Sequence, residues 1–259
     1  CDQNVGNFFF HQDVLFARPN AVAEAGGNRA VANATGVGGS LARFTIVGRH
    51  LYAVDNTSLH VFRLNDPIRP VQVNTVGIGW AIETIFPYGD NLFIGSQTGM
   101  FIFDNRNPDE PVMLSVFSHA TACDPVFVDG TIAYVTLREG NECQTNINQL
   151  DVVDVSNLLN PRLLHTYPMH RPAGLSVLSD HLYLCEDDQG LKVFDVAELD
   201  KIDERLVDHE EGFRAYDVIT LNKGDAEIAM VIGEDGLYQF DISDPSNLRR
   251  LSVLPVSGN

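Results

Sequence analysis

"GLYQFDISDPSNLRRL" (236–251) is the stretch of sequence that decides the fold, because its pattern also occurs twice upstream. The earlier copies are "SLHVFRLNDPIRPVQV" (58–73) and "GMFIFDNRNPDEPVML" (99–114). In each copy an apolar run is followed by aspartate or asparagine, then proline, then a second apolar run. Such a turn between two β-branched or aromatic runs predicts a pair of neighbouring strands.

The apolar residue before this turn recurs five times, at intervals of about 41 to 50 residues. The residues at this position are Phe62, Phe103, Val153, Phe194 and Phe240. An aspartate follows each of them except the first, which is followed by Arg63. Two more short apolar runs precede each turn, for example "RFTIVG" (43–48) and "HLYAVD" (50–55) before the first. Each repeat therefore predicts four strands.

Four-stranded units at this period are typical of β-propeller blades, which stack in a closed ring because one blade cannot bury both of its faces. We predict an all-β fold, a five-bladed β-propeller with four antiparallel strands per blade and an irregular N-terminal arm. A stack of two β-sandwiches is the main alternative. The predicted segments are a tether and packing arm at 1–43 and a propeller at 44–256, with blades at about 44–80, 81–121, 122–171, 172–213 and 214–256.

The stretches "LYAVDNTSLHVFRLNDPIRP", "LFIGSQTGMFIFDNRNPDEP" and "LYLCEDDQGLKVFDV" resemble the LVIVD-repeat proteins, a family of bacterial envelope β-propellers. The resemblance covers about residues 44–256. It departs at Arg63 and in the fourth repeat, where "AELDKIDE" replaces the proline turn. The resemblance implies a lipid-anchored envelope protein and supplies no catalytic residues.

The net charge of -18 makes nucleic acid a poor partner, because such a surface repels phosphate groups. No apolar run is long enough to cross a membrane.

The four cysteines form no CxxC pair, which argues against zinc-ribbon and thioredoxin-type sites. Cysteine in first position, followed by "DQNVGN", suggests a lipid anchor at Cys1, and an arbitrary boundary is the alternative.

Functional side chains gather in four loops that lead into the first strand of a blade, around residues 80–83, 119–124, 170–173 and 213–217. In a propeller these loops share one face with the hairpins between second and third strands. We therefore predict a binding funnel at this channel mouth, for a sugar, a peptide end or another small polar molecule. The alternative is that these residues only fill and cap a narrow channel. The candidates are Trp80, Glu83, His119, Asp124, His170, Arg171, Arg214, Tyr216 and Asp217.

Two other interpretations of the function use residues of the same loops. A metal site would use His119, Asp124 and His170, whose spacing matches no HExxH-like motif, although a propeller can gather ligands from different blades. Ordinary surface histidines are the favoured interpretation, and we predict no metal or other cofactor. A hydrolase would pair Glu83 with Asp124 or Asp217 as acid and base. The acidic turns "EDDQG" (186–190) and "GEDG" (233–236) match no calcium loop and are explained as tight hairpins.

The third repeat contains an insertion, "REGNECQTNINQ" (138–149), on the funnel face. Cys123 and Cys143 lie on this face, so we predict a disulfide between them in an oxidising compartment, with two free thiols as the alternative. Cys185, inside a strand, is expected to be a buried small apolar residue.

Together these features predict a non-enzymatic lipoprotein of the bacterial cell envelope that binds a small polar ligand or an envelope protein. Its membrane contact would be only through the lipid at Cys1. The alternative is a hydrolase acting on a carbohydrate or lactone.

Overall fold

The computed structural model describes residues 38–118, 125–139, 147–222, 224 and 226–256. This part of the chain is built from short strands and a single 3-10 turn, η1 (Ile202–Glu204). The strands are β1 (Phe44–Val47), β2 (His50–Val54), β3 (Ser58–Arg63), β4 (Val71–Gly77), β5 (Ile82–Tyr88), β6 (Asn91–Ser96), β7 (Gly99–Asp104), β8 (Val112–Ser118), β9 (Val126–Asp129), β10 (Ile132–Leu137), β11 (Gln149–Asp154), β12 (Arg162–Pro168), β13 (Leu175–Leu178), β14 (His181–Cys185), β15 (Leu191–Asp195), β16 (Leu206–Glu210), β17 (Ala215–Asn222), β18 (Glu227–Gly233), β19 (Gly236–Asp241) and β20 (Arg249–Pro255). Among these residues no helix has the length and hydrophobicity needed to cross a bilayer.

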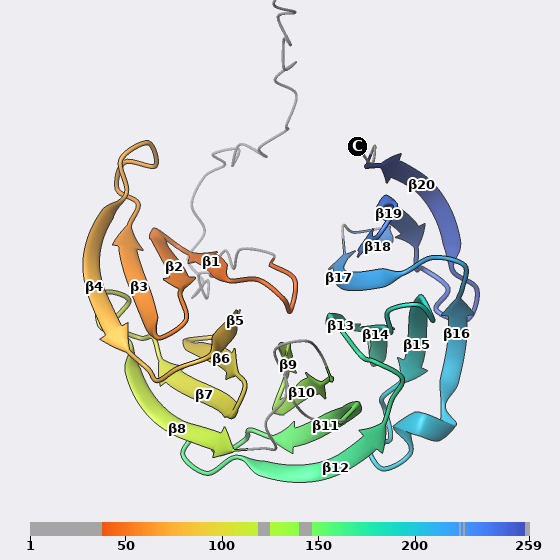
Figure 1. The fold of residues 1–259 in the computed structure, drawn as a ribbon, viewed down its shortest axis with the longest axis horizontal. Helices are drawn as coiled ribbons and strands as arrows, with labels where there is room; N and C mark the ends of the chain where they lie inside the picture. Colours follow the sequence, from red (N-terminus) through yellow and green to blue (C-terminus); the bar gives the residue numbers. More distant parts are fainter. Residues whose placement is uncertain (1–37, 119–124, 140–146, 223, 225, 257–259) are drawn as a thin grey trace, which may run out of the picture. The chain divides into compact units, whose positions relative to one another are not determined.

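The strands form five separate sheets, each of four consecutive antiparallel strands in chain order, from β1–β4 to β17–β20. The sheets are arranged around a centre, with β1, β5, β9, β13 and β17 innermost and β4, β8, β12, β16 and β20 outermost (Figure 1). The predicted five-bladed β-propeller with four antiparallel strands per blade is confirmed.

The same irregularity in strand pairing occurs in every blade. In every blade the register between the third and fourth strands shifts at the apolar residue that defined the sequence repeat. A β-bulge bends a strand and increases its twist, so the same bulge gives each blade the same curvature. The shifts occur at Val61/Phe62, Ile102/Phe103, Val152/Val153, Val193/Phe194 and Gln239/Phe240.

The repeated aspartate ends the third strand by capping the turn that follows. In four blades its Oδ1 accepts a hydrogen bond from the backbone N–H two residues on, as in Asp154 to Ser156 at 2.9 Å. An arginine of the same blade pairs with each of these carboxylates, as Arg162 does with Asp154. The pKa of the Asp154 carboxyl is lowered to about 2, because the Ser156 hydroxyl, the Arg162 guanidinium and the Ser156 N–H all favour its ionised form.

The first blade departs from this arrangement because Arg63 stands where the others have aspartate. Its guanidinium crosses to the second blade and pairs with Asp109 at 2.5 Å, and His50 contacts the same carboxylate at 2.8 Å. An ion pair within one blade is thus replaced by one between two blades.

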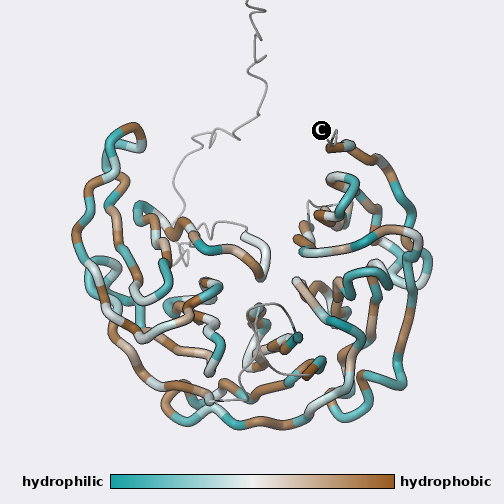
Figure 2. The backbone as a smooth tube through the Cα atoms, in the orientation of Figure 1, coloured by the Kyte–Doolittle hydropathy of each residue, from teal (hydrophilic) through white to brown (hydrophobic). Residues whose placement is uncertain are grey.

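The cores lie between consecutive sheets. The described residues form four clusters of buried side chains, one for each pair of neighbouring sheets from the first to the fifth. The first cluster, for example, joins Tyr52 and Val61 to Ile85, Ile94 and Phe103. Apolar and polar residues alternate along many of the strands, and hydrophilic residues gather in the turns (Figure 2). Fully burying a leucine, isoleucine or phenylalanine contributes about 1.5–3 kcal/mol, so these interfaces hold the blades together.

Hydrogen bonds between blades reinforce each of the four interfaces. A group of one blade contacts the turn before the fourth strand of the next blade. The bonds join Tyr52 Oη to Pro108 O (3.0 Å), Ser115 Oγ to Leu158 O (2.6 Å), Tyr167 Oη to Leu199 O (2.5 Å) and Leu248 N to Asp208 Oδ2 (2.7 Å).

The first and fifth sheets stand apart in Figure 1, and no cluster of described residues joins them. The closed ring expected from the sequence is therefore not formed by packing between these two sheets. Instead a turn at residues 38–43 reaches across the centre. The hydroxyl of Ser40 donates to Asp217 in β17 at 3.1 Å and accepts from the N–H of Leu175 in β13 at 2.8 Å. On its other side the turn bonds the second blade, where Ala42 O accepts from Ile85 N–H at 2.8 Å.

Candidate binding site

Several predicted funnel residues come directly before the inner strands and so lie at the same end of the channel. Trp80 precedes β5 and exposes 67% of its surface, so it is not packed between blades. Arg171 precedes β13, and Arg214 precedes β17. Tyr216 is half-buried in β17, and its carbonyl accepts the N–H of Gly174 at 2.8 Å.

Arg171 and Arg214, here called the arginine pair, are brought together by one carboxylate. Arg171 Nη1 lies 2.7 Å from Asp187 Oδ2, and Arg214 Nε lies 3.1 Å from Asp187 Oδ1. The Asp187 side chain is nearly buried, whereas the arginine side chains are 44% and 42% exposed. Each guanidinium has five N–H donors, so both retain donors that face solvent.

The backbone fixes Asp187 in this position. Asp187 O accepts hydrogen bonds from Gly190 N–H at 3.2 Å, within the β14–β15 hairpin, and from Ala215 N–H at 2.9 Å, at the start of β17. Arg171 and Asp187 both have positive φ angles, 48° and 46°. For residues with a side chain this conformation costs about 1–3 kcal/mol, and it is kept only where the surroundings impose it.

His170 and the other acids of the same hairpin form a second network beside the arginine pair. His170 Nε2 lies 3.0 Å from Asp188 Oδ1, and its backbone N–H donates to Glu186 Oε1 at 2.9 Å. Glu186 is fully buried and also pairs with Lys192. A cavity of about 330 Å³ adjoins this network, lined in part by His170, Glu186, Lys192 and Phe194.

Of the three carboxylates proposed for hydrolysis, the structure describes Glu83 and Asp217, and these two are engaged in separate interactions. Glu83 Oε1 accepts a hydrogen bond from Gln97 Nε2 at 3.0 Å. Asp217 accepts from Ser40, and a Cβ atom added at Gly39 or Gly174 would lie 2.0 Å from its carboxylate oxygens. Asp217 is therefore enclosed on two sides, with no room for a substrate against it.

The remaining predicted residues lie outside the described part of the chain. They are His119, Asp124, Cys1, Cys123 and Cys143, so the lipid anchor, the disulfide and the His119–Asp124–His170 metal set stay untested predictions. Within the described residues, no group of three or more histidines, cysteines, aspartates or glutamates is arranged to hold a metal ion. Cys185 is buried in a strand as predicted. Its thiol is free, and burial raises the pKa of the thiol well above the ordinary value.

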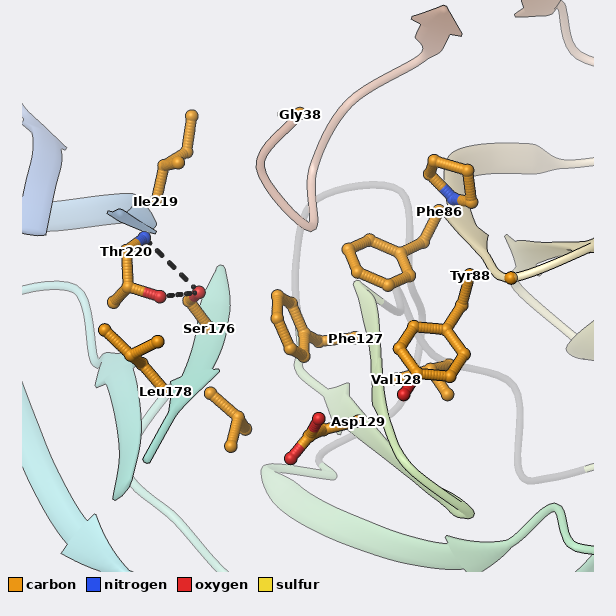
Figure 3. Close-up of a pocket in the computed structure, with 13 residues that line it drawn as sticks. Gly38, Phe86, Tyr88, Phe127, Val128, Asp129, Ser176, Leu178, Ile219 and Thr220 are labelled. Carbon is orange, nitrogen blue, oxygen red and sulfur yellow. Dashed lines mark hydrogen bonds between the residues drawn. The ribbon is translucent and has the colours of Figure 1, made fainter. Parts of the chain in front are cut away.

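A second cavity, of about 300 Å³, opens toward the opposite end of the channel, between the later residues of the inner strands β5, β9, β13 and β17, near the hairpins that follow them. On one side stand the rings of Phe86, Tyr88 and Phe127, with the centroids of Phe86 and Phe127 4.6 Å apart (Figure 3). Across the cavity lie Ser176 and Thr220, whose hydroxyl groups are 2.7 Å apart.

The sequence prediction missed Asp187 and this second cavity. Three consecutive acids in a hairpin on the same predicted face as two arginines were a usable signal for Asp187. In the sequence, Phe86, Tyr88 and Phe127 are only apolar residues of runs that are typical of strands. Alternate side chains of a strand lie on the same face, so these rings can be assigned to the channel only when the inner strands are known to surround it.

The fold and the repeated turn define the class of protein as a β-propeller. Residues 144–168, which include β11 and β12, match the LVIVD repeat. This match confirms the resemblance drawn from the sequence and places one repeat on the third blade.

Solved structures with the same fold share little sequence with this chain. The computationally designed protein Ika8 has 12% identity and a TM-score of 0.56, over 80% of this chain and 60% of that one. The periplasmic gluconolactonase PpgL of Pseudomonas aeruginosa has 14% identity and a TM-score of 0.59, over 81% and 68%. Dihydro-heme d1 dehydrogenase NirN has 13% identity and a TM-score of 0.56, over 86% and 47%.

The chain spans about 60% of the designed protein and less than half of NirN. At these identities the likeness shows the fold alone, since one fold hosts many functions. No curated protein matches the sequence.

Proposed function

We propose that this protein is a non-enzymatic binding propeller that holds a small carboxylate-bearing ligand at the arginine pair. The observation that carries the proposal is Asp187, which holds two partly exposed guanidinium groups side by side at the channel mouth. A guanidinium presents its donors in a planar fork that matches a carboxylate, so two oriented forks favour this class of ligand.

The charges close to the arginine pair favour an anionic ligand, although the chain as a whole is acidic. Two positive groups share one carboxylate, and among the described residues Glu234, at 4.0 Å from Arg214, is the other acid within ion-pair distance of these guanidinium groups. Asp188 is paired with His170. Charges more than about 8 Å apart are largely screened at physiological ionic strength, so the nearest groups dominate the affinity.

The second candidate is hydrolysis of a carbohydrate or lactone, which requires a pair of accessible carboxylates. Among the described residues Glu83 and Asp217 do not form one, because the first is bonded to Gln97 and the second is enclosed. This arrangement supports binding over hydrolysis through these two groups.

Titration calorimetry with glucuronate and its neutral analogue glucuronamide tests the proposal. We expect glucuronate to bind and the amide to bind at least about tenfold more weakly, because a charged hydrogen bond is worth about 1.5–3 kcal/mol. Arg171→Gln and Arg214→Gln should each weaken glucuronate binding about tenfold or more.

Arg249→Gln is the matched control, because Arg249 also pairs with an aspartate but lies on the outer strand β20. It should leave the affinity unchanged. Equal binding of acid and amide, or equal losses in all three variants, would contradict the proposal. Turnover of gluconolactone that follows enzyme concentration would instead favour the hydrolase.

We also propose that the protein works in the bacterial cell envelope, held by a lipid at Cys1, with an envelope protein as the alternative partner. The support is the LVIVD resemblance. Expression of the complete gene in a bacterium with labelled palmitate tests it. Label is expected on the native protein and not on Cys1→Ser, and an unlabelled native protein would contradict the lipid anchor.

A further inference from the structure

The cavity at the hairpin end of the channel is built mainly from apolar side chains of four different blades. Phe86 and Tyr88 come from the second blade, Phe127 from the third, Leu178 from the fourth and Ile219 from the fifth. Its volume of about 300 Å³ is near the lower limit for small-molecule sites. At ~30 Å³ per water molecule it has room for about ten, which suits a ligand with a single ring.

The aromatic side of the cavity is held in place. Phe86 and Phe127 pack together at an interplanar angle of 43°, and the hydroxyl of Tyr88 accepts the N–H of Gly130 at 2.7 Å. Three rings from two blades therefore converge on one side of the cavity (Figure 3). Ring faces carry partial negative charge and attract cations within about 6 Å.

The only charged side chain among the lining residues that the structure describes is Asp129, which is exposed at the end of β9. Within the described part of the chain its carboxylate has no hydrogen-bond or ion-pair partner, unlike the paired carboxylates of the turns. No lysine or arginine lines the described cavity. The net charge of -18 further concentrates cations near the surface.

Across from the rings, Ser176 and Thr220 supply two hydroxyl groups. Ser176 Oγ lies 2.7 Å from Thr220 Oγ1 and is 3.4 Å from the backbone N–H of Thr220. These groups can accept hydrogen bonds from a donor that enters the cavity.

From these features we propose that the cavity is a second binding site, which takes an organic ammonium ion attached to a flat apolar group. The rings and aliphatic side chains cover the apolar part, and Asp129 and the ring faces hold the positive charge. This site differs from the arginine pair in position and in the sign of the charge it selects.

Three probes of similar shape test the inference on the full chain: the cation 2-phenylethylamine, the neutral 2-phenylethanol and the anion phenylacetate. Binding is measured by titration calorimetry at neutral pH. We expect the amine to bind about tenfold more tightly than the alcohol, in line with a cation–π contact together with a nearby carboxylate. Phenylacetate should bind more weakly than either.

The variants separate charge from shape. Asp129→Asn should reduce amine binding to that of the alcohol, and Phe127→Leu should weaken both probes. Asp180→Asn is the matched control, because Asp180 also lies in a hairpin after an inner strand but does not line the cavity. Asp180→Asn should change the binding of neither the amine nor the alcohol. The melting temperature of each variant shows whether it folds.

Equal binding of the three probes, or no binding of the amine at about 10 mM, would overturn the proposal. A loss of amine binding in Asp180→Asn as large as in Asp129→Asn would also overturn it, because the effect would then come from surface charge in general. Arg171→Gln should leave amine binding intact, so the outcome at this cavity is independent of the arginine pair.

Discussion

At the scale of a single residue, the side chain of Asp217 connects the turn at residues 38–43 to the fifth blade. Its carboxylate accepts hydrogen bonds from the hydroxyl of Ser40, and from the N–H groups of Leu41 at 3.4 Å and Val218 at 3.0 Å. Burial nevertheless raises the pKa of Asp217 to about 6, because loss of water penalises the ionised form more than these bonds favour it. The folded protein therefore holds this proton more tightly than the unfolded chain does.

This pKa shift predicts a pH dependence of stability with a definite sign. The stabilisation from protonated Asp217 is complete below about pH 4 and is lost as the pH rises through about 6. The shift corresponds to about 3 kcal/mol at most. Asp217→Asn keeps an oxygen acceptor but has no proton to release. We therefore expect the free energy of unfolding of the variant to increase relative to that of the native protein between about pH 4 and 7. Urea unfolding at several pH values measures this difference. A difference that stays constant or shrinks would show that Asp217 is not responsible.

Trp80 gives a second prediction at this scale. Because its side chain is exposed, Trp80→Ala should leave the melting temperature nearly unchanged. The predicted funnel places it on the same face as the arginine pair, so the variant should lose glucuronate binding. Native affinity in this variant would remove Trp80 from the site while leaving the arginine pair to be tested separately.

At the scale of the element, hydrogen bonds at each interface connect one blade to the turn before the fourth strand of the next blade. Tyr52→Phe removes the hydrogen bond to Pro108 O without changing the packing of the ring, so we expect a loss of about 1 kcal/mol in the free energy of unfolding. Tyr134→Phe is the control, because no described residue bonds its hydroxyl. Chemical denaturation of both variants measures the difference, and equal losses would show that the bond between blades contributes nothing.

The elements were predictable because their causes are local. Asp154 caps a turn two residues away, and Phe240 marks a bulge in its own hairpin, so each leaves a pattern that repeats along the sequence. The meeting of Ser40 with Asp217 depends on residues 177 positions apart, and no local pattern records it. Asp187 was missed for the same reason, since its role depends on arginines from two other loops.

At the scale of the whole molecule, the four interfaces make one continuous arc from the first blade to the fifth, and the Ser40 turn spans its centre. The two ends of the channel differ in chemistry. One end presents guanidinium groups and the other presents aromatic rings with a carboxylate. A propeller can therefore carry two selective sites on one scaffold, because loops at its opposite ends vary independently.

The insertion in the third blade supplies a prediction for the intact protein. If Cys123 and Cys143 are joined, a loop of about 20 residues is closed, which contributes roughly 3 kcal/mol. Mass spectrometry after alkylation without reductant should find these two cysteines unmodified, and reduction should lower the melting temperature. Alkylation of both cysteines without reductant would contradict the disulfide.

The most direct measurement of the central claim is a crystal structure with glucuronate bound. The account predicts that the ligand carboxylate lies within hydrogen-bond distance of both Arg171 and Arg214, with Asp187 still between them. A ligand bound elsewhere on the propeller, with the arginine pair unoccupied, would contradict it.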